Sequence, residues 1–439
     1  MAAVYLPDLG RGFLRDDFAW IESSRAAWSH PLGIVLPDRP GFYRPIVSLS
    51  FAVDYAVHGL SPRGYGFTNL LLLIGCAAAL YQLCRRVGLG TIGAAVAVLA
   101  WTANPHGINM ALVWISGRTA LWLTLFALLA NLAASGRCYA TAAVFLFGAL
   151  LSKEEALALP GILLVWNELV FAPSDRRDRL RLAAALVVPV VAYLFARAHT
   201  AAYTPASAPP YYQFTFAPAA VIVNAFSYLD RGATLAAALT VLAAMLMRLR
   251  PTLTVENRRL AAAGAAWFAI GIAMSVFLPV RSSLYVVFPS IGTAIVCGVL
   301  VESIHRRATV LGRRGLVLEP ALAAALLIAI PIYQQRNDRW VEPARLSQRA
   351  LTVIANGTAL LPNRGAIVLR DAGETSSSFA GAFGTLATDA VRLHTGRDLQ
   401  VWIDPPPPEF RVAGLMPPDR QSVVAYFAVE KGRVFRVDE

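Results

Sequence analysis

The sequence predicts an all-α polytopic membrane bundle that crosses a bilayer roughly ten times, followed by a small C-terminal α/β domain. The chain has 439 residues, of which 57% are hydrophobic and only 15% are charged, and its mean hydropathy is +0.55. Soluble globular chains are less apolar and carry more charge. Long apolar runs recur from residue 67 to residue 333, whereas residues 334–439 are polar. Composition therefore excludes a soluble protein and divides the chain near residue 333.

The first 66 residues contain no clear membrane span. Residues 1–12 hold no apolar run long enough for a signal peptide or a spanning helix, so we expect the chain to begin in a polar loop, with a first span missing upstream as an open alternative. Residues 46–58 are a short apolar run that includes Asp54, and we interpret them as an interfacial amphipathic helix. Residues 1–66 are thus one extramembrane region.

Residues 67–333 are expected to form the transmembrane bundle. Several of their apolar runs are short for a hydrocarbon core of about 30 Å. The expected spans lie at 67–83, 90–103, 119–134, 138–151, 156–171, 182–198, 233–247, 260–279, 284–303 and 316–333.

The arginines between the spans indicate the orientation. If residues 1–66 lie outside the cytoplasm, the arginine-rich connections all lie inside, as the positive-inside rule requires. A full span at 219–231 would reverse this pattern downstream, so we interpret that stretch as re-entrant or interfacial. The inside connections are 85–86, 135–137, 174–181, 248–259 and 305–314.

The net charge of +12 indicates contact with the lipid bilayer and not with nucleic acid. The basic residues form short clusters between apolar runs, and no basic stripe is interleaved with aromatic residues. The four cysteines lie in apolar segments without CxxC spacing, which supports neither a disulfide framework nor a zinc site.

Residues 334–439 are expected to form the small α/β domain. Ten spans after an extracytoplasmic N-terminal region place this domain outside the cytoplasm as well. Alternating and periodic patterns predict its elements. They are strands at 366–369 and 399–403, a helix at 380–394 and a hairpin at 423–437 around Lys431 and Gly432. A second outer segment, 198–218, is rich in proline and aromatic residues, and we expect a structured surface loop there, with an acceptor groove as the alternative.

Two adjacent carboxylates, Asp16 and Asp17, lie in the polar segment 13–44. Such a pair can act as a general base, bind a divalent metal, or face water in an ordinary loop. The predicted topology places more polar residues on the same outer face: His106, Arg118, Lys153, Glu154 and Arg281. Taken singly, each has an ordinary explanation as a snorkelling side chain or a local ion pair. Together they predict an outer cavity where a carboxylate accepts a proton and cations hold a phosphate, as group transfer from an anionic lipid carrier requires.

Short motifs follow one another in an order that resembles the GT-C superfamily of membrane glycosyltransferases. The closest likeness is to bacterial relatives of protein O-mannosyltransferases and to the transmembrane-and-tetratricopeptide-repeat mannosyltransferases, over residues 10–333. The motifs are DDF at 16–18, YRPI at 43–46, GYGFTN at 64–69, NPHGINMALVWISGR at 104–118, LLSKEEALALP at 150–160 and LYVVFPSIG at 284–292.

The resemblance implies an enzyme that moves a sugar from a polyprenyl-phosphate donor to an acceptor outside the cytoplasm, with inversion at the anomeric carbon. The leading candidate for the sugar is a mannose-like hexose. The acceptor class, whether protein, lipid or glycan, stays open. The implied location is the bacterial inner membrane. Asp16 takes the role of catalytic base, and Asp17 is a helper or a ligand of a divalent metal, which is not certain to be needed. Candidates to bind the lipid phosphate are Arg118 and Arg281, then Arg44, Lys153 and His106, with Glu154 orienting Lys153.

The chain also departs from the family pattern. Phe67 stands where relatives often have histidine, Pro105 and His106 are in reversed order, and Ser282 and Ser283 replace a Glu-Arg pair. No tetratricopeptide repeats follow the last span. The alternative is a non-catalytic membrane protein such as a transporter of lipid-linked glycans, for which internal repeats and charges at mid-membrane are expected. The unusual charges of this chain lie instead at outer span ends.

Overall fold

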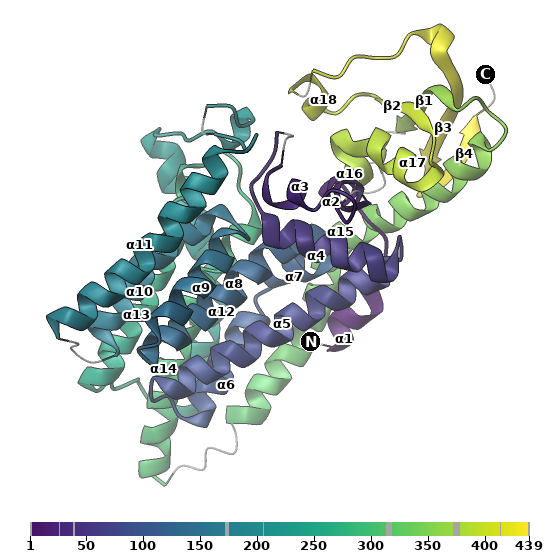
Figure 1. The fold of residues 1–439 in the computed structure, drawn as a ribbon. Coiled ribbons are helices and arrows are strands. Elements are labelled where there is room, and N and C mark those ends of the chain that lie inside the picture. The colour runs from purple at the N-terminus through teal and green to yellow at the C-terminus, as the bar shows by residue number, and fades with distance from the viewer. Residues whose placement is uncertain are drawn as a thin grey trace.

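A long helical bundle with a small sheet domain at one end makes up the computed structural model (Figure 1). The structure describes residues 2–25, 27–37, 40–171, 175–204, 206–312, 318–371, 378–412 and 414–437. Each predicted apolar run overlaps one helix of the bundle. These helices are α5 (Pro62–Arg86), α6 (Thr91–Thr102), α8 (Arg118–Ser135), α9 (Tyr139–Leu150), α10 (Leu159–Leu169), α11 (Arg176–Ala198), α12 (Pro218–Met247), α13 (Val255–Ile272), α14 (Ser290–Val310) and α15 (Leu318–Thr358).

Five helical segments among the described residues are long and apolar enough to cross a membrane, which makes this an integral membrane protein. They are Pro62–Arg86, Ile115–Ser135, Arg176–Ala198, Pro218–Met247 and Val255–Phe277. The α6 and α9 helices are apolar but have only 12 residues each, which gives a length of about 18 Å. The structure therefore supports a polytopic helical bundle but does not confirm the count of ten spans.

Close packing of the bundle depends on small residues. A Cβ atom at Gly292 of α14 would collide with the Gly264 carbonyl of α13, and one at Gly298 would meet the Gly93 carbonyl of α6. Glycines let neighbouring backbones approach in this way in membrane bundles. The contacts hold α14 between α6 and α13.

The re-entrant interpretation of residues 219–231 was wrong. These residues form the first part of the continuous helix α12, which begins with Pro218 at its first position and ends at Met247. Proline is well suited to the first turn because its missing N–H needs no partner there. Since the expected span 233–247 belongs to the same helix, the number of crossings predicted downstream does not change.

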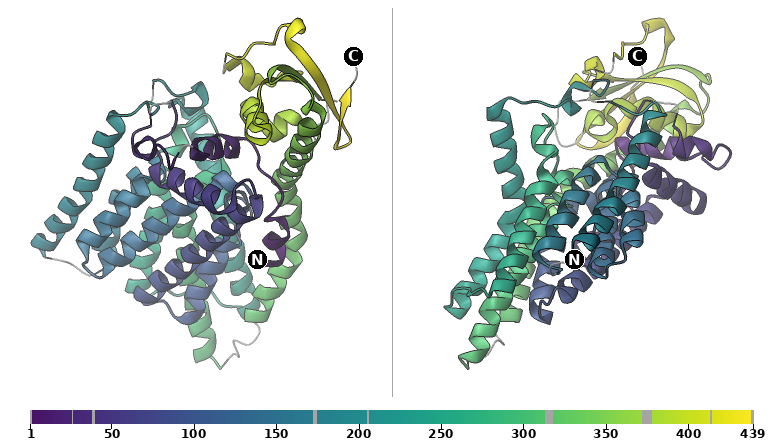
Figure 2. Two further views of the ribbon diagram at one scale, coloured as in Figure 1. Left: turned by 45° about the vertical axis from the view of Figure 1, so that its right-hand side comes forward. Right: turned by 60° about the vertical axis from the view of Figure 1, so that its left-hand side comes forward.

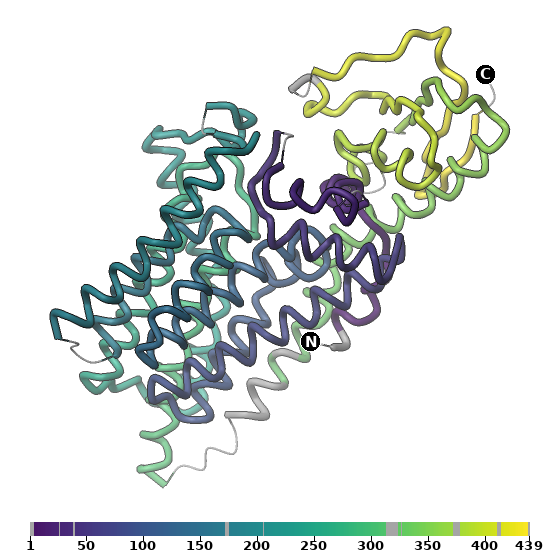
Figure 3. Tube along the Cα trace, viewed as in Figure 1, coloured from purple at the N-terminus to yellow at the C-terminus, as the bar shows by residue number. Residues whose placement is uncertain are grey.

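Most of the N-terminal segment, drawn in purple, lies at the bundle end that carries the sheet domain, whereas its first helix lies lower, beside α15 (Figure 3). Its helices are α1 (Ala2–Tyr5), α2 (Asp16–Arg25), α3 (Leu32–Val35) and α4 (Pro45–His58). Helix α4 confirms the helix expected at 46–58, and it buries Val47, Phe51 and Asp54 on one face.

The C-terminal domain has the predicted elements. Strands β1 (Arg364–Asp371), β2 (Asp398–Asp404), β3 (Val423–Glu430) and β4 (Arg433–Val437) form one sheet in the order β2-β1-β3-β4. The first three are parallel, and β4 pairs antiparallel with β3. Lys431 and Gly432 both have positive φ, as a tight hairpin turn requires. Helices α16 (Phe379–Phe383) and α17 (Ala387–Thr395) join β1 to β2.

The predicted domain boundaries do not coincide with breaks in the structure. Helix α5 begins at Pro62, and α15 continues past residue 333 to Thr358, so it links the bundle to the sheet domain (Figure 2). One hydrophobic core also joins the two ends of the chain, because Phe18 of α2 and Phe51 of α4 belong to the same buried cluster as Phe383 of α16. The N-terminal segment and the C-terminal domain are therefore packed as one unit.

Replacing Phe383 with alanine is expected to destabilise this shared core. The side chain is fully buried, and its ring centroid lies 5.8 Å from that of Phe18. Phe→Ala in a core costs about 3–5 kcal/mol, so the free energy of unfolding in mixed micelles should fall by that amount. Phe435→Ala on β4, where the ring is 43% exposed, is the matched control. Equal, small losses in the two variants would show that the two ends of the chain do not share a core.

Candidate active site

The residue before the acidic pair is held by the C-terminal domain. Arg15 donates its backbone N–H to Ala382 O and its Nε to Gly381 O, each at 3.0 Å. Its φ is +49°, which is uncommon for a residue other than glycine. Helix α2 begins at the next residue, Asp16. Contacts from α16 therefore set the position from which the Asp16 side chain projects.

The Asp17 side chain points inward, and both of its carboxylate oxygens accept hydrogen bonds. Its Oδ2 accepts from Leu14 N at 3.0 Å, and its Oδ1 accepts from Ser116 N at 2.8 Å and from the Ser116 hydroxyl. The side chain is fully buried, and burial raises its pKa to about 6. This geometry does not support Asp17 as a catalytic helper or metal ligand. Its carboxylate ties α2 to the turn before α8.

Asp16 points the other way and is exposed. Within the described residues its carboxylate accepts no side-chain hydrogen bond, so both oxygens are available. Its pKa is nevertheless raised, because the surrounding protein disfavours the charged form more than Arg15 and Arg44 favour it. An accessible carboxylate with a raised pKa, in electrostatic reach of a guanidinium, fits the task of a general base.

Arg44, which stands just before α4, forms a partly buried ion pair with Glu154. Its Nη2 lies 2.8 Å from Glu154 Oε2, its Nε lies 3.2 Å from the same oxygen, and the two side chains are each 13% exposed. Burial alone would raise the pKa of Glu154, but Arg44 outweighs it and the pKa is lowered. No hydrogen bond from Arg44 Nη1 is found in the described residues.

Lys153 forms a second ion pair beside the first. Its Nζ lies 2.6 Å from Glu155 Oε1 and 4.7 Å from the ring centroid of Tyr285. Both partners are less than one-tenth exposed. The prediction that Glu154 orients Lys153 therefore needs a correction: Glu155 is the partner of Lys153, and Glu154 is the partner of Arg44. The SKEE stretch thus orients two cations through adjacent carboxylates.

Two tyrosines from the loop between α11 and α12 lie beside these ion pairs, and the sequence did not single them out. Burial raises the pKa of Tyr212 to about 12, with a further contribution from Asp16 that Arg44 opposes. The Tyr212 ring packs edge-on against Phe42 at 5.1 Å, and Phe42 in turn lies 4.2 Å below the Arg44 guanidinium. Burial, Asp16 and Tyr203 likewise raise the pKa of Tyr211. The aromatic content of residues 198–218 was the available signal.

Arg281 lies beside the first part of α12. Its Nε donates to Asn224 Oδ1 at 2.7 Å, while Asn224 is fixed by bonds to Val276 O and Leu278 O, both at 2.9 Å. The guanidinium is exposed, and within the described part of the chain its two terminal nitrogens make no hydrogen bond. Arg281 is therefore the cation of this region with the most free donors.

Arg118 was predicted to bind a phosphate, but the structure gives it other partners. It is completely buried and donates to Asp54 Oδ2 at 2.6 Å, Asn69 Oδ1 at 3.0 Å and Tyr65 O at 3.0 Å. Its guanidinium also lies 4.3 Å from the Phe51 ring centroid. These contacts join α4, α5 and α8, so the geometry supports a structural role and not phosphate binding.

His106 is also engaged elsewhere. Its Nδ1 lies 3.0 Å from Arg336 Nη1 on α15, and burial together with that guanidinium lowers its pKa. None of its described contacts is with the acidic pair. Among the described residues, no three or more His, Cys, Asp or Glu side chains are arranged to hold a metal ion.

Comparisons with known proteins identify the fold. No family model and no curated protein matches the sequence. The crystal structure of ArnT from Cupriavidus metallidurans bound to undecaprenyl phosphate matches with a TM-score of 0.54 and 14% identity, over 98% of this chain and 95% of that chain. ArnT from the same organism in the apo state matches with a TM-score of 0.53 and 15% identity, over 91% and 83%. This chain therefore has the fold of ArnT along nearly its whole length.

Proposed function

We propose that this protein is a GT-C glycosyltransferase that moves a sugar from a polyprenyl-phosphate donor to an acceptor outside the cytoplasm. The likeness to ArnT, a GT-C glycosyltransferase, supports the superfamily and the lipid-linked donor. It does not favour the mannosyltransferase subtype, so a mannose-like hexose is only the first sugar to test. The observation that carries the proposal is the accessible Asp16 carboxylate within electrostatic reach of Arg44.

In the proposed reaction, Asp16 removes the proton from an acceptor hydroxyl as the hydroxyl oxygen bonds to the anomeric carbon. The bond from that carbon to the phosphate oxygen breaks, and polyprenyl phosphate leaves from the opposite face, so the configuration inverts. Cations stabilise the negative charge that develops on the leaving phosphate. Arg44, Lys153 and Arg281 take this role in our proposal.

In our proposal the two carboxylates of residues 152–155 (SKEE) orient the cations and do not act on the sugar. Glu154 holds Arg44 and Glu155 holds Lys153 in fixed orientations. Fixed donors lower the reorganisation needed when a phosphate binds. Each cation keeps donors for a second anion, since ammonium has three N–H groups and guanidinium has five.

The test is turnover by the purified protein in lipid nanodiscs. Undecaprenyl-phosphate-linked hexoses and pentoses would be supplied one at a time with extracted cell-envelope lipids, glycans and proteins. Mass spectrometry should detect a sugar-modified acceptor together with stoichiometric release of undecaprenyl phosphate. Protein that binds every donor without releasing undecaprenyl phosphate would contradict the proposal and favour the non-catalytic alternative.

The pH dependence follows from the raised pKa of Asp16. A general base works only when ionised, so kcat/KM should fall as the pH drops through the pKa of Asp16 in the folded protein. Since this pKa lies above its ordinary value, the acidic limb should lie above that of a free aspartate. The measurement is a pH profile of kcat/KM, with folding checked at each pH. A rate that stays constant down to pH values near the ordinary aspartate pKa of about 3.9 would argue against Asp16 as the base.

A further inference from the structure

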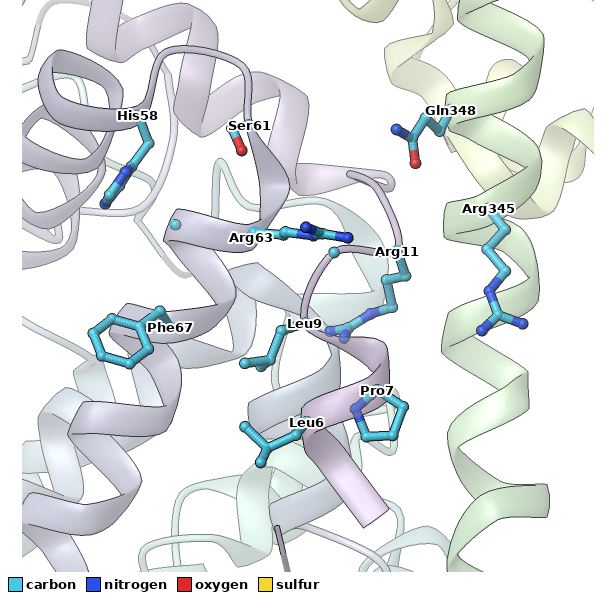
Figure 4. A pocket seen from close by; sticks show the side chains of 12 residues that line it. Leu6, Pro7, Leu9, Arg11, His58, Ser61, Arg63, Phe67, Arg345 and Gln348 are labelled. Atoms are coloured by element: carbon cyan, nitrogen blue, oxygen red, sulfur yellow. The ribbon is translucent and has the colours of Figure 1, made fainter. Parts of the chain in front are cut away.

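A basic pocket shares no lining residue with the candidate active site, which comprises Asp16, Arg44, Lys153 and Arg281. The pocket has no part in the proposed reaction. Its volume is about 870 Å³, and it opens between the first residues of the chain, the turn from α4 to α5, and α15. Polar side chains that line it include Arg11, His58, Arg63, Arg345 and Gln348. Figure 4 shows Arg63 reaching from α5 toward the segment that carries Arg11, with Arg345 and Gln348 opposite on α15.

The positive charge of this pocket is only partly compensated. Three arginines line it. Asp8 and Glu342 pair with Arg345 at 3.4 and 3.3 Å, and Asp8 and Asp17 also interact electrostatically with Arg11. Arg63 makes no hydrogen bond or ion pair in the described residues. Arg11 is 5% exposed, and its two Nη atoms donate to Asp8 O and Leu112 O, whereas its Nε has no hydrogen-bond partner among the described residues. Arg63 is exposed, so its free guanidinium can bind an anion that enters the pocket. The unpartnered Nε of Arg11 adds a buried donor, and leaving such a group unpaired is costly. The pocket is therefore suited to an anion.

An apolar stripe leads away from the pocket along α5. Phe67, which lines the pocket, is 52% exposed, and Leu71 and Ile74 are 52% and 55% exposed. Together with Arg63 they lie at positions i, i+4, i+8 and i+11, which is one face of a helix. Because α5 is long and apolar enough to cross a membrane, this face is exposed where acyl chains are expected. The pocket lies at the N-terminal end of the same helix.

We propose that this surface binds one anionic membrane phospholipid. Its phosphate group occupies the pocket between Arg63 and Arg11, with Arg345 and Gln348 as further donors. Its acyl chains lie against Phe67, Leu71 and Ile74. Arginine is suited to this task because its planar fork matches phosphate oxygens. A soluble phosphate would use the pocket but gain nothing from the stripe.

Lipid retention by the full chain tests the proposal. The purified protein, stripped of lipid in detergent, is titrated with phosphatidylglycerol and observed by native mass spectrometry. Arg63→Gln should weaken binding of the first phosphatidylglycerol by roughly tenfold, the effect of one lost charge-assisted contact. Arg258→Gln, an exposed arginine on α13, is the matched control and should change binding less than twofold, within the roughly 0.4 kcal/mol expected of a surface substitution. Equal binding by wild type and Arg63→Gln, or equal losses in both variants, would overturn the proposal.

Three further ligands separate the sources of the anion. Phosphatidylcholine and inorganic phosphate should each compete poorly with phosphatidylglycerol, and a short-chain phosphatidylglycerol should bind more weakly than the long-chain form. If inorganic phosphate displaced phosphatidylglycerol at equal concentration, the pocket would be a site for a soluble anion, and the proposal of a bound phospholipid would be wrong. If the short-chain and long-chain forms of phosphatidylglycerol bound equally well, the acyl chains would not contact the apolar stripe, and the proposal would also be wrong.

Discussion

Asp16→Asn should abolish sugar transfer while leaving the protein folded. The carboxylate is exposed and accepts no side-chain hydrogen bond from the described residues, so its loss disturbs no packing. General-base catalysis contributes about 10²–10⁴-fold to rate, and kcat should fall by that factor with undecaprenyl-phosphate-linked donors. Affinity for undecaprenyl phosphate should be retained.

The Asp17→Asn variant should lose stability, in contrast to the loss of activity expected for Asp16→Asn. The Asp17 carboxylate accepts bonds from Leu14 N and from both donors of Ser116. Asparagine cannot reproduce all of these, so the free energy of unfolding should fall by roughly 1–3 kcal/mol. Activity per folded molecule should change much less than in Asp16→Asn. If instead Asp17→Asn lost turnover with full stability and Asp16→Asn kept it, the two aspartates would have to exchange roles.

Arg118→Met should give the largest loss of stability of any single arginine considered above. It leaves Asp54 as a buried charge without its cation, and breaking a buried ion pair in this way costs about 3–5 kcal/mol. The double variant Arg118→Met, Asp54→Leu should recover most of the loss, because no uncompensated charge remains. Equilibrium unfolding in mixed micelles measures both, with Arg258→Met as the exposed control.

The kinetics of folded Arg118→Met separate the structural role from the one predicted by the sequence. An arginine that binds the donor phosphate would raise KM for the donor when removed. An arginine that only joins α4, α5 and α8 would leave KM unchanged in the molecules that remain folded. A large increase in KM with unchanged stability would restore Arg118 to the phosphate site.

The sequence predicted the helices of the bundle and the elements of the C-terminal domain because local periodicity encodes them. It could not predict which polar residues meet. Asp16 and Asp17 are adjacent in sequence, yet the first turn of α2 sends one outward and the other into the core. Arg118 precedes an apolar run and Arg281 follows one, but among the described residues only Arg118 has an aspartate, Asp54, placed by another helix to neutralise it.

Long-range packing explains the other differences. The bond from Arg15 to the Gly381 carbonyl joins residues 366 positions apart, and no local pattern reveals such a contact. Tyr212 reaches the site from a loop that the sequence predicted as a surface loop, with an acceptor groove as the alternative. The continuous helix α15 crosses the boundary that composition placed at residue 333, since a helix can leave the membrane without a break.

A structure of the protein in nanodiscs with bound undecaprenyl phosphate tests the central claim most directly. The phosphate is expected within hydrogen-bond distance of Arg44, Lys153 or Arg281, on the side of the cluster that Asp16 faces. Phosphate density elsewhere, with Arg44 and Lys153 contacting only Glu154 and Glu155, would contradict the proposed site.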